Sequence, residues 1–206
     1  MIWFTADTHY GDKKIIHYMN RPFKSVEEMN NTLIENWNKK VDERDLVYHL
    51  GDFGFGDPDP ILSKLKGFKK LVIGSHDRDA AKSDIWVAKD TRMDIWELNI
   101  PITLSHYCMR VWPKSHYNSY MLYGHSHGFL KSQGKSHDVG VDCNNFTPLS
   151  FLEVAALMEK KPDNFNLVKR MRTPTDIKEE DDNFIPVDEN VENIQGPKNG
   201  QTPSGN

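Results

Sequence analysis

Side chains that could bind metal ions or transfer protons recur through the first 130 residues of the chain. The set combines Asp carboxylates with His imidazoles and contains no Cys. Its members are Asp7 and His9, Asp52, His76 and Asp77, His106, and His125 and His127. Carboxylates and imidazoles without thiolates suit Mn²⁺, Fe, Zn²⁺ or Ni²⁺ better than Ca²⁺ or a structural zinc ion. We therefore predict a catalytic metal site.

Each of these groups follows closely on a short apolar run. The runs are rich in branched or aromatic residues, which favours buried strands. They cover residues 2–5, 46–50, 71–73, 102–104 and 120–123. In open α/β sheets, the loops at the carboxyl ends of the strands converge on one crevice. We therefore expect the Asp and His side chains to meet in space although they are far apart in the sequence.

Two capping boxes predict where helices begin. Ser25 with Glu28, and Ser150 with Glu153, each precede apolar residues at helical spacing. A pair of prolines at positions 58 and 60 indicates the start of a weaker helix. Helices are thus predicted from residue 26 to about 37, from 58 to about 65, and over 151–159. Strands that alternate with helices predict an α/β architecture.

The length of 206 residues suits one ordinary domain with its own core. After Arg172 the apolar periodicity stops, and Thr, Pro, Asp, Glu, Asn and Gly dominate. Such a composition cannot offset the entropy lost on ordering. We predict a catalytic domain over 1–172 and a flexible acidic tail over 173–206.

The charge distribution argues against a general nucleic-acid binder. The net charge is -4, and residues 173–206 carry eight acidic residues against two Lys, or -6, which leaves +2 for residues 1–172. A nearly neutral body lacks the basic face that replaces counterions along a phosphate backbone. The two Cys form no Cys-x-x-Cys pair, and no leader or membrane span is evident. We expect a cytoplasmic protein without a membrane partner.

Six ligands of this kind are enough for two ions. A two-metal site can hold a bridging hydroxide and clamp the oxygens of an in-line displacement at phosphorus. Hydrolysis of a phosphate ester is therefore the reaction that the residues favour.

The order of the motifs resembles that of the calcineurin-like metallophosphoesterase superfamily. The shared blocks are Asp-x-His, Gly-Asp, Gly-Asn-His-Asp or Glu, a lone His, and Gly-His-x-His, and this chain has them in that order with one exception. The resemblance covers roughly residues 1–160 and looks closest to the small single-domain bacterial and phage members. It implies a four-layer sandwich of two facing mixed β-sheets flanked by helices.

The resemblance also implies a role for each residue of the site. Two divalent ions are expected, with Mn²⁺ as the first choice. The first ion would be held by Asp7, His9 and His127, the second by His106 and His125, and both by Asp52. His76 would contact the scissile phosphate and assist the leaving oxygen, while Asp77 would bond to the far nitrogen of His76.

Ser75 is the exception, because the superfamily has a metal-binding Asn at this position. A hydroxyl is shorter and a poorer neutral donor, so we expect a weaker second metal site. Arg78 could reach the substrate phosphate through its guanidinium group, although a surface ion pair is an equal alternative.

The sequence leaves the substrate open. Phosphomonoesters, phosphodiesters, nucleotides and cyclic nucleotides all fit the predicted chemistry, and a nuclease is a further alternative. A different class is a catalytically weak, metal-binding interaction protein on the same fold, which Ser75 favours. The six other metal ligands and His76 argue against it, because a scaffold has no physical need for them.

Overall fold

The computed structural model describes residues 1–164. The predicted acidic tail and the last residues of the predicted domain lie outside this range. The first sheet has the strand order β4-β3-β2-β1-β9. Its strands are β1 (Ile2–Thr5), β2 (Leu46–His49), β3 (Phe68–Val72), β4 (Ala88–Asp90) and β9 (Leu149–Ser150). Strands β1 to β4 are parallel, and β9 pairs antiparallel to β1.

The second sheet has the order β5-β6-β7-β8. Its strands are β5 (Arg92–Glu97), β6 (Ile100–Ser105), β7 (Tyr120–Tyr123) and β8 (Ser136–Asp138). The pair β5 and β6 is antiparallel, whereas β6, β7 and β8 run parallel. Both sheets are therefore mixed, as expected.

The described helices are α1 (Lys13–Tyr18), α2 (Val26–Lys40), α3 (Asp59–Leu62) and α4 (Phe151–Glu159). Ser25 and Ser150 cap α2 and α4, and the second capping box is complete. These two predictions are confirmed, while α3 is shorter than expected. Helix α1 was not predicted, and Asp12 begins it by accepting a bond from the Lys14 amide at 2.7 Å.

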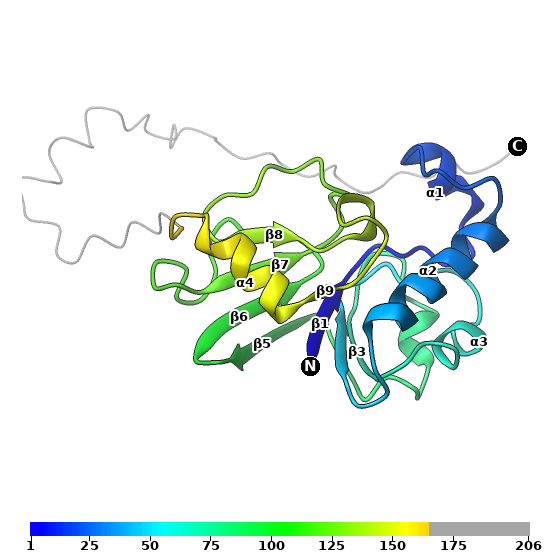
Figure 1. The fold of residues 1–206 in the computed structure, drawn as a ribbon, viewed down its shortest axis with the longest axis horizontal. Helices are drawn as coiled ribbons and strands as arrows, with labels where there is room; N and C mark the ends of the chain where they lie inside the picture. Colours follow the sequence, from blue (N-terminus) through cyan, green and yellow to red (C-terminus); the bar gives the residue numbers. More distant parts are fainter. Residues whose placement is uncertain (165–206) are drawn as a thin grey trace, which may run out of the picture. The chain divides into compact units, whose positions relative to one another are not determined.

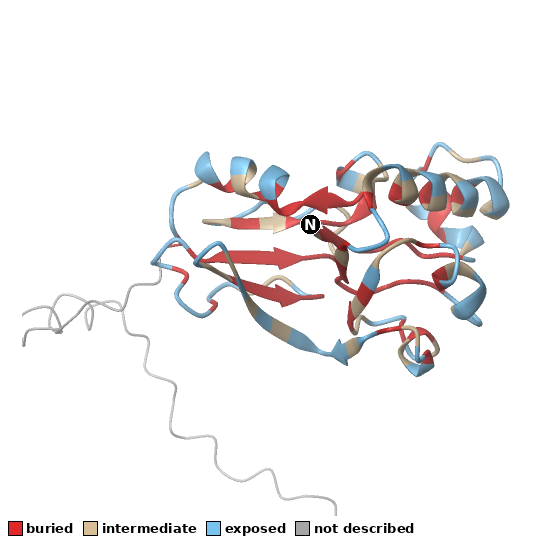
Figure 2. Ribbon diagram, turned by 60° about the horizontal axis from the view of Figure 1, so that its bottom comes forward, coloured by how far each residue is buried: buried red, intermediate tan, exposed pale blue. Residues whose placement is uncertain are grey.

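One apolar core contains side chains from both sheets. It includes Phe4 and Leu50 from the first sheet and its loops, and Leu104 and Leu122 from the second. A separate core lies between the first sheet and α2, whose Trp37 is 1 % exposed. Figures 1 and 2 show α1, α2 and α3 beside the first sheet, with their exposed faces away from it. Burial of these apolar surfaces is the main stabilising term.

The outer face of the second sheet packs against the segment between β6 and β7. Trp112 from this segment is buried against Met121 and Tyr123 of β7, and its indole nitrogen donates to the Ser119 carbonyl at 3.3 Å. Two mixed sheets with helices are thus present, but the expected four-layer arrangement is not confirmed. Within residues 1–164, each helix is too short or too polar to cross a bilayer.

Candidate metal centre

The candidate ligands sit in loops with an unusual backbone conformation. Asp7, His9, Asp52, His125 and His127 all have positive φ angles, between 46° and 65°. For residues with a Cβ this conformation costs on the order of 1–3 kcal/mol, and it persists only where the surroundings enforce it. The Asp7 amide donates to the Gly51 carbonyl at 2.9 Å, and the His9 amide donates to the Asp52 carbonyl at 3.0 Å. The loops after β1 and β2 therefore hold each other in this shape.

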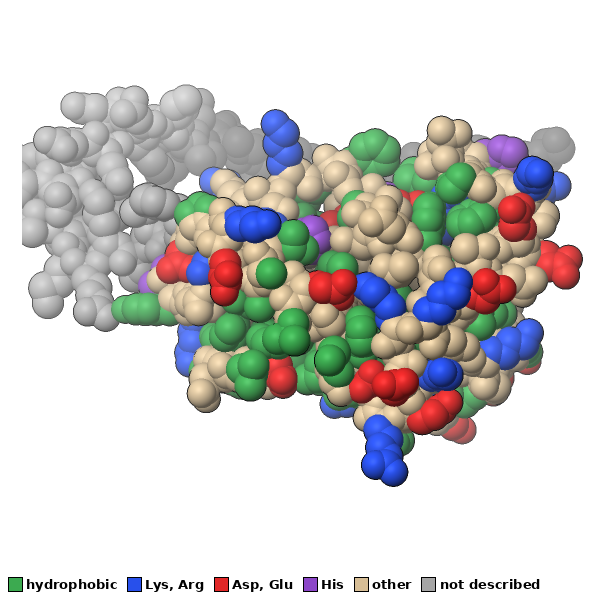
Figure 3. Space-filling model, in the orientation of Figure 1, with side chains coloured by type: hydrophobic (Ala, Val, Ile, Leu, Met, Phe, Trp, Pro, Cys, Tyr) green, Lys and Arg blue, Asp and Glu red, His purple; other side chains and the backbone are tan. Residues whose placement is uncertain are grey.

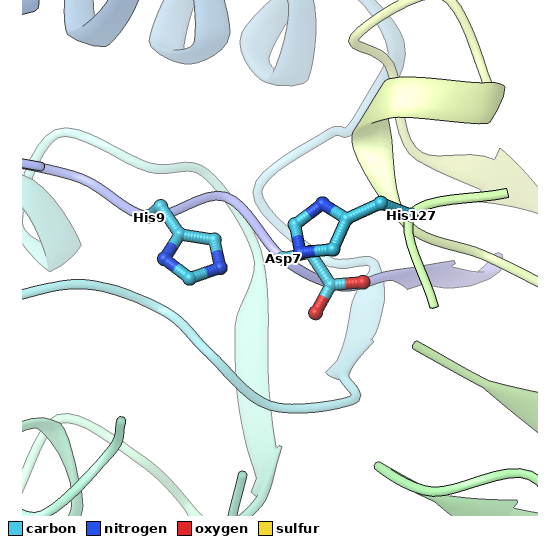
Figure 4. A group of neighbouring side chains, drawn as sticks. All are labelled: Asp7, His9 and His127. Atoms are coloured by element: carbon cyan, nitrogen blue, oxygen red, sulfur yellow. The ribbon is translucent and has the colours of Figure 1, made fainter. Parts of the chain in front are cut away.

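Asp7, His9 and His127 form the first cluster. Each offers one ligand atom, and these atoms all lie within 4.8 Å of one another. Asp7 and His9 come from the segment after β1, and His127 comes from the segment after β7 (Figure 4). The imidazole centroids of His9 and His127 are 5.4 Å apart. The cluster thus joins the ends of strands from both sheets.

Asp52, His106 and His125 form the second cluster, with ligand atoms again within 4.8 Å of one another. The Asp52 Oδ2 atom lies 3.4 Å from His106 Nε2 and 3.7 Å from His9 Nε2 of the first cluster. One carboxylate oxygen therefore faces an imidazole from each cluster. This is the position that a carboxylate bridging two ions requires.

Unpaired buried nitrogens test whether the residues fit metal ions. Both ring nitrogens of His9 and the Nε2 atom of His106 are buried without a hydrogen-bond partner among the described residues. Such atoms cost about 1–3 kcal/mol each when left unsatisfied. Divalent ions would satisfy one ring nitrogen of His9 and the Nε2 atom of His106, and the mixed Asp and His donors suit such ions. The residues present therefore fit two metal ions.

Glycines let the backbone approach these side chains closely. A Cβ atom at Gly74 would lie 2.5 Å from Asp52 Oδ1, and one at Gly51 would lie 2.5 Å from His106 Nδ1. Gly51 also has a φ of 95°, which favours glycine. Larger residues at these two positions would displace the second cluster.

A buried ion pair that the sequence analysis missed supports the first cluster. His127 Nδ1 lies 2.6 Å from Asp142 Oδ2, which leaves Nε2 for a metal ion. Arg21 donates to both carboxylate oxygens of Asp142, at 2.7 and 2.8 Å, and to the carbonyls of Asp7 and Thr8. A carboxylate behind a ligating imidazole fixes its tautomer and orientation. Arg21 thus links Asp142, the partner of His127, to the backbone that carries Asp7.

The protonation states favour metal binding at Asp52 and at His9. Burial lowers the pKa of His9 to about 4, so the ring is neutral at pH 7. Burial would raise the pKa of Asp52, but the His106 ring, whose Nε2 atom lies 3.4 Å from Asp52 Oδ2, outweighs it and holds that pKa below its usual range. Burial raises the pKa of Asp7 to about 7. A neutral imidazole and an ionised carboxylate are the forms that bind metals.

Ser75 and His76 lie beside Asp52. The Ser75 hydroxyl donates to the Asp52 carboxylate, with oxygen distances of 3.1 and 3.2 Å, and the His76 amide donates to Asp52 Oδ1 at 2.8 Å. The His76 side chain is exposed, and its ring centroid is 5.7 Å from that of His9. Both residues therefore border the clusters without belonging to either.

The prediction that Asp77 orients His76 is wrong. Asp77 is fully buried, and its carboxylate accepts bonds from the amides of Asp52, Phe53 and Gly74 at 2.7–2.8 Å. A buried carboxylate needs such donors, whereas the His76 ring is exposed. Asp77 instead joins the loops that follow β2 and β3.

Arg78 lies on the surface with 89 % of its side chain exposed, and its Nε atom is 3.7 Å from Asp79 Oδ1. It does not line the cavity beside the clusters. This placement agrees with the surface ion pair that the sequence left as the alternative to phosphate binding.

A cavity of about 570 Å³ opens beside both clusters. Five predicted site residues line it: His9, Asp52, His76, His125 and His127. A second cavity, of about 680 Å³, is lined by Asp57, Asp59, Asp79 and Asp84 and by no His. The smaller cavity is therefore the one where a substrate would meet metal ions.

The chain has a relative that it matches over most of its length. No family model matches the sequence. The chain is 31% identical over 172 residues to the uncharacterized protein MJ1445 of Methanocaldococcus jannaschii, which covers 77% of this chain and 92% of that protein. The chain therefore belongs to the same family as MJ1445, and its two ligand clusters are made of the residues through which the sequence resembles the calcineurin-like metallophosphoesterase superfamily.

A solved structure has a similar fold. A protein of unknown function from Aquifex aeolicus, AQ665, has a TM-score of 0.63 and 25% identity, over 76% of this chain and 98% of that chain. YfcE, a phosphoesterase from E. coli, is a weaker match, with a TM-score of 0.38 and 16% identity over 68% of this chain and 77% of that chain.

Proposed function

We propose that the chain is a binuclear, metal-dependent phosphoesterase. The observation that supports this most directly is the placement of Asp52 between two clusters of metal-ligand side chains. Two divalent ions, when bound, would neutralise phosphoryl oxygens and activate a water for attack on phosphorus. Mn²⁺ is our first choice, with Fe, Zn²⁺ and Ni²⁺ as alternatives that suit the same donors.

The residues of the chain would divide the remaining work. Asp7, His9 and His127 would hold one ion, and His106 and His125 would hold the other, with Asp52 near both. As the oxygen of water bonds to phosphorus, the ester P–O bond breaks and the leaving oxygen needs a proton. His76 is exposed beside the cavity and would donate that proton.

The proposal is tested by incubating the purified chain with each metal and a chromogenic phosphodiester or phosphomonoester. We expect turnover that a chelator abolishes and that Asp52→Asn lowers by at least about 100-fold, since a carboxamide binds both ions more weakly. Metal binding measured by calorimetry accompanies the assay. Tight binding of metal without turnover of any ester would instead support the interaction protein.

Ser75 supports a weaker second metal site. Its hydroxyl bonds to the Asp52 carboxylate, whereas an Asn side chain is longer and offers an amide oxygen. We expect Ser75→Asn to lower the dissociation constant of the second ion by about 10-fold or more, within the range seen for residues that tune metal sites. Calorimetric titration with Mn²⁺ measures both sites. Equal affinities at both sites in both proteins would contradict a weakened site.

A further inference from the structure

The cavity beside the clusters has an apolar wall that metal binding does not require. The wall consists of Ile15 and Tyr18 from α1, Met19 at the C-terminal cap of α1, and Phe55 from the loop after β2. Tyr18 is 71% exposed and Phe55 is 51% exposed. Ile15 belongs to the core, but two exposed aromatic rings at a cavity rim gain nothing from folding. We call these four residues the α1–Phe55 wall.

The position of Phe55 is fixed relative to the reactive groups. Its amide donates to the Tyr10 carbonyl at 2.9 Å, in the segment that carries Asp7 and His9. Its ring centroid lies 5.3 Å from that of His76. A group attached to a phosphate at the metal clusters would therefore reach the Phe55 ring directly.

The charge of the lining favours a substrate with little negative charge. Lys14 is the single cation among the residues that line the cavity, and Asp12 lies beside it. On the face shown in Figure 3, Lys and Arg are interspersed with Asp and Glu and form no broad basic area. A phosphomonoester dianion would find few positive groups beyond the metal ions, whereas a diester carries one charge and two organic groups.

We propose that the α1–Phe55 wall binds an aromatic group of a phosphodiester substrate, and that a nucleobase is the form of this group in the cell. The proposal rests on the proposed function, because it requires that the phosphate of the substrate binds at the two clusters beside the wall. Bases stack on aromatic side chains with little dependence on sequence. The wall thus selects nucleotide diesters over esters of the same charge without a ring.

A matched pair of substrates tests the proposal. One is the dinucleotide thymidylyl-thymidine, and the other is the same molecule with both bases replaced by hydrogen. We expect Phe55→Ala and Tyr18→Ala each to lower kcat/KM for the first substrate by about 10- to 100-fold, with little change for the second. Phe68→Ala, at a ring that is 57% exposed and outside the cavity lining, is the matched control.

A binding measurement separates failure of this inference from failure of the proposed function. Thymidylyl-thymidine is titrated into the chain in the presence of a chelator, and Phe55→Ala should raise the dissociation constant by a similar factor. Cleavage of neither substrate would refute the phosphoesterase, while the binding measurement would still decide the role of the wall. Equal cleavage of both substrates, unchanged by Phe55→Ala, would refute the proposal that the α1–Phe55 wall binds a nucleobase.

Discussion

Replacement of His76 by alanine is expected to lower kcat by about 10²- to 10⁴-fold, the usual contribution of a general acid. The ring is exposed at the cavity, 5.7 Å from the His9 ring, and belongs to neither ligand cluster. The leaving oxygen would then take its proton from water. Steady-state kinetics at saturating diester measure kcat, and atomic absorption measures the metal content, which should stay unchanged.

His116→Ala is the control for this substitution, because His116 is also exposed but does not line the cavity. Its kcat should equal that of the native chain. Loss of metal from the His76 variant would indicate that His76 is a metal ligand. An unchanged kcat in the His76 variant would show that His76 does not act in the reaction.

Replacement of Arg21 by alanine is expected to lower the free energy of unfolding by about 3–5 kcal/mol, the usual cost of removing one partner of a buried ion pair. The Arg21 side chain is fully buried, and Asp142 is 9 % exposed. The substitution removes both guanidinium bonds to the buried Asp142 carboxylate and removes the donor to the carbonyls of Asp7 and Thr8. Urea unfolding of the metal-free chain measures this free energy.

The same variant should bind the first metal ion about 10- to 100-fold more weakly, because Asp142, the hydrogen-bond partner of His127, is no longer fixed by Arg21. Lys39→Ala removes an exposed pair with Glu35, whose atoms are 3.8 Å apart, and should change the stability by at most about 1 kcal/mol. If both variants lose equally little stability, the Arg21 pair is not a structural support.

Local patterns predicted the elements that local interactions determine. Residues 2–5 and 120–123 are strands β1 and β7 with the predicted bounds, and the capping boxes give the starts of α2 and α4. Strand β9 has only two residues and exists through its pairing with β1, which lies more than 140 positions away. Strand β5 is an edge strand with alternating exposure and no continuous apolar run. Their sequences carry no comparable signal.

In the site, too, some residues could be predicted from local patterns and others depend on long-range contacts. The clusters follow from motifs at the ends of strands, which both the residue types and the superfamily resemblance indicate. Arg21 and Asp142 are 121 positions apart, and neither is next to a predicted ligand in sequence. Asp77 was misassigned because it adjoins His76 in the chain, although its carboxylate turns into the protein interior. Long-range packing decides these positions.

The first cluster takes Asp7 from the segment after a strand of one sheet and His127 from the segment after a strand of the other. During synthesis, a ribosome must therefore release the chain at least as far as His127 before that ion has a place to bind. Metal binding at the first cluster is then a late event, which follows the packing of the two sheets. Because the ion recognises only the assembled form, an ion at 100 times its dissociation constant would add about 2.7 kcal/mol to that form.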